Sequence, residues 1–212
     1  MMAHRGGRRI PRSVEFFENQ FRRQVREADF ALNPFEALSL NFLSGELLDL
    51  GCGLGNLALE AARRGCRVTA VDASPSAIAR IRRTAQEESL AVDASVEDLA
   101  TYAIENDYDT IVAIGLLMFF HRERGLELLE QIKERIRPGG RAIVNVLVEG
   151  TTFLDMFLPG HYHLFGREEL RERFAGWKEI AWRSESYPAP NETNKEFTTL
   201  IAEKPSGIPP RG

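Results

Sequence analysis

Cysteine is nearly absent from this 212-residue sequence, which contains only Cys52 and Cys66. Two cysteines are too few for a disulfide-stabilised scaffold, and neither has further cysteines or histidines at the spacing of a zinc ligand set. We therefore expect no disulfide framework and no metal site. A reducing, cytoplasmic environment is the default expectation for such a chain.

Long apolar runs are also missing. The longest nearly unbroken one, residues 111–120, is about half of the roughly 20 residues that a membrane-spanning helix needs. The basic residues near the start are not followed by an apolar stretch, so this region does not have the pattern of a secretory signal. We expect no association with membranes.

Charge of one sign does not dominate the sequence. It has 27 Lys and Arg against 31 Asp and Glu, a net charge of −4. A nucleic-acid-binding domain is usually strongly basic, so we expect no nucleic-acid partner. The content of 43% hydrophobic and 27% charged residues is ordinary for a soluble globular protein, and the length fits one domain.

The composition divides the chain into a body and two tails. Residues 1–12 combine four arginines with glycine and proline, and we expect a disordered basic tail there. Residues 205–212 are rich in proline and glycine and are expected to form a second disordered tail. Between them, residues 13–204 form one domain.

Strand-like and helix-like periods alternate through the body. Apolar or β-branched runs predict strands, and capped segments with apolar residues three and four apart predict helices. This alternation favours an α/β fold with a doubly wound, mostly parallel, Rossmann-like sheet of seven strands, closed by an antiparallel C-terminal strand. Ligands bind such sheets beyond the carboxyl ends of the strands. The expected strands are 46–50, 67–72, 90–94, 108–115, 141–148, and a hairpin-like pair near 180–183 and 197–202.

A glycine-rich loop follows the first expected strand. Gly51, Gly53 and Gly55 alternate between this strand and a helix, where glycine permits positive φ and close approach of a ligand to the backbone. Asn56 stands where a dinucleotide-binding fingerprint has its third glycine, which disfavours a nicotinamide-dependent oxidoreductase. A tight turn without a ligand is the alternative interpretation.

Two aspartates follow the next two strands. Asp72 comes 21 positions after Gly51 and could accept hydrogen bonds from both ribose hydroxyls. A helix cap is the alternative, although Ser74 and the following proline already form a cap. Asp98 could bind the amine of adenine beside the backbone of Leu99, or it could be an ordinary turn residue.

The order of these motifs resembles that of class I S-adenosylmethionine-dependent methyltransferases. The resemblance rests on DLGCGLGN at 49–56, VTAVDASP at 68–75, VEDL at 96–99 and RPGG at 137–140. A narrower similarity to the TehB-like tellurite-resistance methyltransferases rests on YDTIVAIGLLMFF, EELRERFAGW and FTTLIAEK. The segment 186–192 lacks the His-Arg pair of the narrower family, which counts against tellurite as the substrate.

This resemblance implies the reaction and the cofactor. S-adenosylmethionine would be consumed and S-adenosylhomocysteine produced, with methyl transfer to a small-molecule acceptor. A soft or metalloid anion, as in tellurite resistance, is one acceptor class. A non-catalytic S-adenosylmethionine sensor or scaffold is the alternative, and both a monomer and a homodimer remain open. The resemblance places cofactor contacts at Asp49, Gly51, Cys52, Gly53, Gly55, Asn56, Asp72, Ala73, Asp98, Leu99, Gly115 and Leu116.

The acceptor side of the site is less defined by the sequence. Residues 13–44 are expected to form an N-terminal helical lid over the cofactor, with plain core packing as the alternative. A soft nucleophile needs no general base. The catalytic residue is therefore unknown, with His121 and Tyr162 as candidates that could equally be ordinary surface residues. The residues expected to contact the acceptor are Arg22, Arg26, Phe153 and Tyr162.

Overall fold

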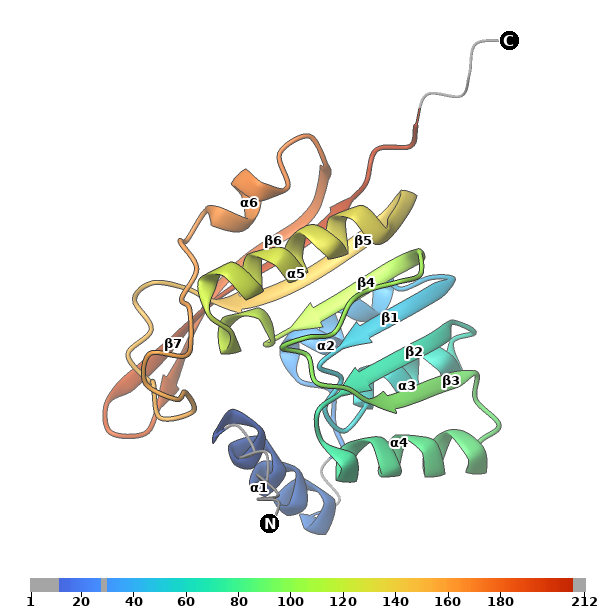
Figure 1. Ribbon diagram of the computed structural model, residues 1–212, viewed down its shortest axis with the longest axis horizontal. Helices are drawn as coiled ribbons and strands as arrows, with labels where there is room; N and C mark the ends of the chain where they lie inside the picture. The colour runs from blue at the N-terminus through green and yellow to red at the C-terminus, as the bar shows by residue number, and fades with distance from the viewer. Residues whose placement is uncertain (1–11, 28–29, 208–212) are drawn as a thin grey trace, which may run out of the picture.

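One seven-stranded sheet organises the residues that the computed structural model describes, 12–27 and 30–207 (Figure 1). Its strands lie in the order β3-β2-β1-β4-β5-β7-β6. Strands β1 to β5 pair in parallel, and β7 is antiparallel to both of its neighbours. The expected fold class is confirmed. The strands are β1 (Glu46–Leu50), β2 (Arg67–Asp72), β3 (Val92–Val96), β4 (Tyr108–Ile114), β5 (Ile136–Leu147), β6 (Lys178–Ala189) and β7 (Thr193–Glu203).

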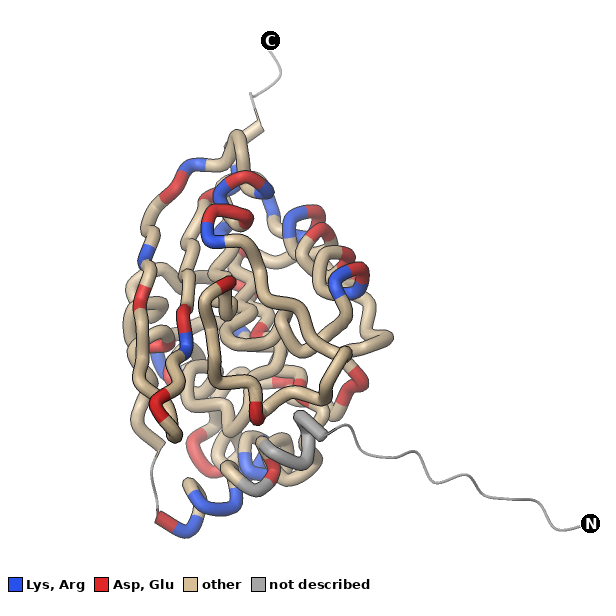
Figure 2. The backbone as a smooth tube through the Cα atoms, turned by 90° about the vertical axis from the view of Figure 1, so that its left-hand side faces the viewer, with Lys and Arg blue, Asp and Glu red and all other residues tan. Residues whose placement is uncertain are grey.

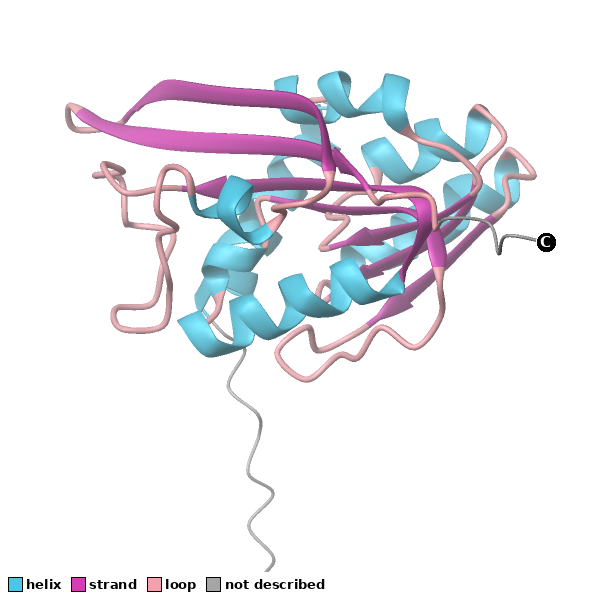
Figure 3. Cartoon of the chain, turned by 90° about the horizontal axis from the view of Figure 1, so that it is seen from above, coloured by secondary structure: helices cyan, strands magenta, loops and turns pink. Residues whose placement is uncertain are grey.

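Helices cover both faces of this sheet (Figure 3). Successive side chains of a strand point to opposite faces, so β1 places Leu47 in one apolar core and Leu48 in the other. The first core is closed by α3 and α4, and the second by α5. The helices are α1 (Arg12–Glu27), α2 (Pro34–Ser39), α3 (Asn56–Arg63), α4 (Pro75–Glu87), α5 (Arg122–Arg135) and α6 (Glu169–Arg173), with short 3-10 turns η1 (Leu40–Phe42) and η2 (Leu117–Phe119).

Local sequence signals fix several of these helix starts. Ser74 caps α4 by accepting a hydrogen bond from the backbone N–H of Ala77, and Pro75 occupies the first helical position. Asn33 and Glu36 form a reciprocal capping box at the start of α2. These caps position the N-terminal ends of α2 and α4 beside the carboxyl edge of the sheet.

The start of β5 differs from the sequence prediction. We expected residues 137–140 to be a turn and the strand to begin at Arg141, but β5 begins at Ile136, which pairs with Tyr108. The register shifts in this region. A Cβ on Gly140 would lie only 2.7 Å from the backbone oxygen of Asp109, so glycine is what permits this close approach.

The predicted tails lie mostly outside the described residues. Of the N-terminal tail, Arg12 alone is described, and it is the first residue of α1 rather than part of a tail. Of the C-terminal tail, residues 205–207 are described and belong to no helix or strand. In the described part of the chain, no helix is long and apolar enough to cross a membrane.

Helix α1 lies across the tips of the central strands (Figure 1). The Glu18 carboxylate accepts hydrogen bonds from Ser74 Oγ at 2.6 Å and Ser76 Oγ at 2.8 Å. On the neighbouring turn, the ring of Phe17 packs edge-on against Phe119. The helix is therefore attached both to α4 and to the segment that follows β4. Acidic and basic residues are interspersed along the rest of the chain (Figure 2).

Candidate functional site

A cavity of about 1480 Å³ lies at the carboxyl edge of the sheet. Because parallel strands end at the same edge, residues far apart in the sequence meet there. The cavity is lined by residues that end or follow four strands and by part of α1. Of the predicted cofactor-contacting residues, those that line it are Asp49, Gly51, Cys52, Gly53, Asn56, Asp72, Ala73, Asp98, Leu99, Gly115 and Leu116.

The glycine loop is held close to the sheet by backbone hydrogen bonds. The N–H groups of Gly51 and Cys52 donate to the Val71 carbonyl at 2.8 and 3.1 Å. Gly51 has a φ of 69°, and a Cβ there would come within 2.9 Å of the Leu116 side chain. A side chain at this position would therefore narrow the floor of the cavity.

Gly55 has a different place from the other two glycines. It does not line the cavity, and a Cβ on it would lie 2.4 Å from Ile81 of α4. It is also the N-cap of α3, with a φ of 74°. Its observed role is to pack the loop against α4, and its predicted contact with the cofactor stays a prediction.

Asp72 joins the glycine loop to the start of α4. One carboxylate oxygen accepts from Gly53 N at 2.9 Å and the other from Ser74 N at 2.8 Å. Burial raises the pKa of Asp72 even though these hydrogen bonds act in the opposite direction. Each carboxylate oxygen has a second lone pair, so both retain the capacity to accept a hydrogen bond from a ligand.

Asp49 is the most perturbed acid of the cavity. Its residue is only 4% exposed, and no hydrogen bond to its carboxylate is present among the described residues. Burial, and to a smaller extent the nearby carboxylates of Glu36 and Asp72, together raise the pKa of Asp49 to about 8. A buried carboxylate without a partner is costly, and a cationic ligand removes that cost.

Glu36 is a cavity residue that the sequence analysis missed. It accepts a hydrogen bond from Asn33 N at 2.8 Å, and burial raises its pKa. In the sequence, Asn33 and Glu36 have only the spacing of a capping box, which predicts a helix start and not a position beside Asp49. The fold brings α2 to the cavity wall and thereby adds this carboxyl group.

Two asparagines of the cavity wall have a buried side-chain oxygen without a hydrogen-bond partner among the described residues. Asn145 of β5 is fully buried, and its Nδ2 donates to Thr199 Oγ1 at 2.9 Å while its Oδ1 has no partner. The same holds for Oδ1 of Asn56. Asn145 is a single polar residue among the apolar residues 142–148, and this pattern could have indicated a position at the cavity. The sequence analysis did not predict it.

The end of the cavity near β3 is formed by Asp98 and Leu99. The Asp98 carboxylate accepts from Ala100 N at 3.1 Å, so it also forms the local turn that was the alternative interpretation. The Leu99 carbonyl accepts from Arg124 at 2.9 Å. Arg124 also donates to the Tyr102 carbonyl and forms an ion pair with Glu127. The Arg124 guanidinium therefore stabilises the loop that contains Leu99 and Tyr102.

Cys52 lines the cavity but is not a reactive thiol. It is buried, and burial together with the nearby carboxylates of Asp49 and Asp72 raises its pKa well above the usual value. The thiol is therefore protonated at neutral pH and is not a nucleophile.

The residues predicted to contact the acceptor are not gathered in this cavity. Arg22 and Arg26 line a separate cavity of about 750 Å³ between α1 and α4. Phe153 and Tyr162 pack in a small apolar cluster beyond β5, where Tyr162 stacks on Phe157 with ring centroids 4.5 Å apart. Of the two candidate catalytic residues, His121 lines the large cavity and Tyr162 does not.

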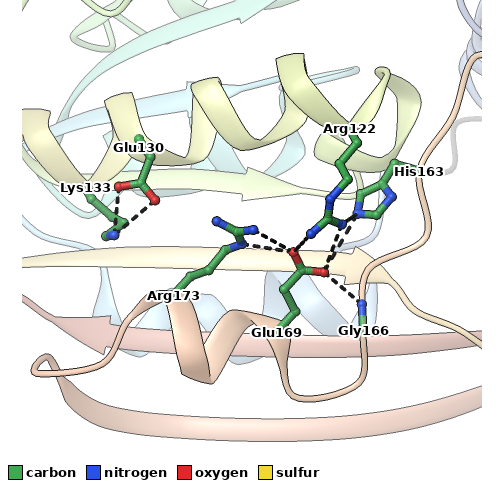
Figure 4. A network of polar contacts seen from close by, with 7 residues as sticks. All are labelled: Arg122, Glu130, Lys133, His163, Gly166, Glu169 and Arg173. Atoms are coloured by element: carbon green, nitrogen blue, oxygen red, sulfur yellow. Dashed lines mark hydrogen bonds and ion pairs between the residues drawn. The ribbon is translucent and has the colours of Figure 1, made fainter.

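A polar network explains the histidine that follows Tyr162. Glu169 binds the N–H of Gly166 and the guanidinium groups of Arg122 and Arg173, and Arg122 donates to His163 (Figure 4). Burial and the adjacent Arg122 lower the pKa of His163, which keeps it neutral as an acceptor. His163 thus belongs to the contacts that hold the loop after β5 against α5. His121 lies instead beside His161, with ring centroids 4.6 Å apart at the cavity wall.

Comparison with known proteins shows which proteins the chain is similar to. Residues 47–140 match a family described as "Methyltransferase domain". The chain is 32% identical over 165 residues to hemagglutinin 1 of Eikenella corrodens, covering 74% of this chain and 54% of that protein. It is 28% identical over 166 residues to a probable S-adenosyl-L-methionine-dependent methyltransferase, TehB of Haemophilus influenzae, covering 75% of this chain and 57% of that protein. The chain spans about half the length of these curated relatives.

Solved structures give the same result for the fold. TehB from Haemophilus influenzae superposes with a TM-score of 0.72 and 23% identity, covering 91% of this chain and 67% of that one. The N-methyltransferase NodS from Bradyrhizobium japonicum, bound to S-adenosyl-l-homocysteine, superposes with a TM-score of 0.67 and 19% identity, covering 92% and 99%. The predicted resemblance to class I S-adenosylmethionine-dependent methyltransferases and to TehB is confirmed.

The residues that line the cavity also suit S-adenosylmethionine chemically, independently of these comparisons. S-adenosylmethionine carries a cationic sulfonium and a cationic ammonium, and the cavity contains the unpartnered, buried carboxylate of Asp49. Its ribose and adenine offer hydrogen-bond donors, and Asp72 and Asp98 offer acceptors at the adjoining strand ends. The glycine loop supplies backbone without side chains between them. We therefore find that the residues present fit the cofactor.

Proposed function

We propose that this chain transfers a methyl group from S-adenosylmethionine to a small-molecule acceptor. The observation that carries the proposal is the meeting of Asp49, Asp72 and the glycine loop in one cavity of about 1480 Å³. Pockets for a single drug-sized ligand measure about 300–1,000 Å³, so this one has room for cofactor and acceptor together.

The cofactor would supply a methyl group that is already activated because it is attached to a sulfonium. When the acceptor takes the methyl group, the rest of the cofactor is a neutral thioether, which is a good leaving group. The chain's own part is to bind, orient and exclude water. Asp49 would hold the cationic end of the cofactor and Asp72 its ribose. Helix α1, attached through Glu18 to Ser74 and Ser76, covers this end of the cavity.

The residues around the cavity favour an acceptor that needs little help from a base. The imidazoles of His121 and His161 face each other at the wall, and both belong to exposed residues. A soft nucleophile such as a thiolate or a metalloid anion reacts without proton removal. The similarity to TehB supports the metalloid acceptor class.

A methyl-transfer assay tests the proposal. Purified full-length chain is incubated with S-adenosylmethionine labelled on its methyl group and with thiols, phenols, amines, selenite and tellurite in turn. Labelled product from at least one small molecule is the expected result. Tight binding of the cofactor without turnover on any acceptor would instead favour a sensor or scaffold.

A further inference from the structure

Three aromatic rings from α2, β6 and β7 form one wall of the cavity. Phe35 of α2 lies 4.8 Å from Phe197 and 5.6 Å from Tyr187, and Tyr187 lies 5.9 Å from Phe197, all between ring centroids. All three residues line the cavity. We call them the aromatic triad. Two of the three contacts are edge-on and one is tilted, which is the geometry that aromatic rings prefer.

The sheet order separates this triad from the cofactor residues. The predicted cofactor residues end or follow β1 to β4, whereas Tyr187 belongs to β6 and Phe197 to β7. Phe197 pairs with Leu147, two residues beyond Asn145. Two strand spacings, about 10 Å, lie between β4 and β7 in the order β4-β5-β7. The triad therefore borders a second part of the cavity, which we call the acceptor lobe.

Lys195 is the basic residue next to the acceptor lobe, because it pairs with Tyr187 across β6 and β7. Among the described residues that line the cavity, the Lys and Arg residues are Arg124 and Lys195. Arg124 is committed to the carbonyls of Leu99 and Tyr102 at the opposite end. The ammonium of Lys195 lies 5.1 Å from the ring centroid of Phe153. Two acids lie next to the triad: Glu185 accepts a hydrogen bond from Tyr187 Oη at 3.2 Å, and Glu36 lies on the same short helix as Phe35.

We propose that the acceptor is a flat aromatic molecule whose ring packs in the acceptor lobe against Phe35, Tyr187 and Phe197. This inference rests on the proposed methyl transfer and names its substrate class. A lone pair on the acceptor's thiolate sulfur forms the new bond to the methyl carbon. The pair of the broken methyl–sulfur bond stays on the cofactor's sulfur, and a thiolate acceptor has no proton to lose.

Binding to the product complex tests the inference without requiring turnover. The full-length chain is saturated with S-adenosylhomocysteine, and thiophenol or its saturated counterpart cyclohexanethiol is titrated in by calorimetry. We expect thiophenol to bind about tenfold more tightly, because an aromatic ring gains ring–ring contacts that a saturated ring does not. Equal affinities, or no binding of either thiol to the saturated complex, would overturn the inference.

Variants locate the binding to the triad. Phe197→Leu keeps an apolar side chain but removes a ring, so the preference for thiophenol should fall to about threefold or less. Leu154→Ala is the matched control, because Leu154 is exposed and does not line the cavity, and the preference should stay unchanged. An unchanged preference in Phe197→Leu would contradict the assignment.

The cofactor titration separates this inference from the proposed function. Wild type and Phe197→Leu should bind S-adenosylhomocysteine equally, since Phe197 lies outside the cofactor residues. Failure of the wild-type chain to bind S-adenosylhomocysteine would contradict the proposed function itself. Binding of S-adenosylhomocysteine, together with methylation of tellurite in preference to thiophenol, would overturn only the aromatic acceptor.

Discussion

At the residue scale, burial makes ionisation of one carboxyl group in the cavity, that of Asp49, energetically unfavourable. Asp49 is buried among other acids, and this environment raises its pKa to about 8. An unfolded aspartate has a pKa of about 3.9, so the folded state favours the protonated form. The free protein therefore loses stability as pH rises from about 4 to about 8. A cation bound beside Asp49 reverses this preference and ionises the carboxyl group.

Binding of S-adenosylhomocysteine should therefore release a proton at pH 7. Calorimetric titrations in buffers of different ionisation enthalpy measure this release as a dependence of the observed enthalpy on the buffer. Asp49→Asn, which has no proton to lose, should remove most of that dependence. A wild-type enthalpy that is the same in all buffers would contradict the role of Asp49.

Asp72 offers a second test at a single residue. Asp72→Ala removes the proposed acceptor for two ribose hydroxyls and also releases the N–H groups of Gly53 and Ser74. Cofactor binding should weaken by about 1–3 kcal/mol. Asp72→Asn keeps one acceptor oxygen and should lose less, which separates ligand contact from loop support. Equal cofactor affinity in the wild type and in Asp72→Ala, measured by calorimetry, would argue against the ribose contact.

At the scale of elements, the segments with local signals were the predictable ones. The glycine loop, the Ser74 cap and the strand before Asp72 lie where the sequence placed them, because caps and short apolar strands depend on neighbours in the chain. The predicted start of β5 was wrong, because the pairing of Ile136 with Tyr108 is a long-range contact. This pairing tolerates the bulge at Gly139 and Gly140.

Only the part of the candidate site that Asp49, Asp72 and the glycine loop form was predictable from the sequence. Asp49, Asp72 and the glycines belong to motifs of fixed spacing, so the sequence pointed to them directly. Glu36 and Phe197 enter the cavity through tertiary placement of α2 and of the β6–β7 hairpin, which no local pattern reports. Tyr162 packs on Phe157 and does not line the cavity, so its predicted contact with the acceptor stays a prediction.

Helix α1 gives an element-scale prediction. Its attachment depends on Glu18, whose carboxylate binds Ser74 and Ser76. Glu18→Ala should loosen α1 and expose the bonds after Arg22 and Arg23 to trypsin. We expect cleavage in α1 to be about five- to tenfold faster, because about 1–1.5 kcal/mol of local hydrogen bonding is lost. Glu27→Ala, on the same helix, is the control, and equal cleavage rates in both variants would contradict the attachment.

The loop after β5 gives a second prediction at the scale of elements. Burial alone would raise the pKa of Glu169, but hydrogen bonds from Gly166, Arg122 and Arg173 outweigh it and lower the pKa to about 2. An unfolded glutamate titrates near 4.3, so this stabilisation is present above about pH 4.3 and is lost as pH falls toward 2. Glu169→Gln should unfold about 1–3 kcal/mol more easily at pH 7, with a smaller difference at pH 3. Denaturant unfolding at both pH values measures this, and an equal difference at the two would count against the network.

At the scale of the whole molecule, one sheet serves two purposes along one edge. Strands β1 to β4 end in or lead to the residues predicted to hold the cofactor, and the antiparallel end of the sheet supplies Tyr187 and Phe197 of the aromatic triad. Two apolar cores on opposite faces hold this edge in place. The order of the strands thus places the acceptor lobe beside the cofactor residues within one continuous cavity.

A crystal structure of the chain with S-adenosylhomocysteine would show directly whether the cavity binds the cofactor. We expect the ribose on Asp72, the amino group beside Asp49 and the sulfur near Gly115, with the acceptor lobe still open toward Phe197. A ligand bound elsewhere on the molecule, or a cavity filled by the chain's own side chains while the ligand is absent from it, would contradict the proposed cofactor site.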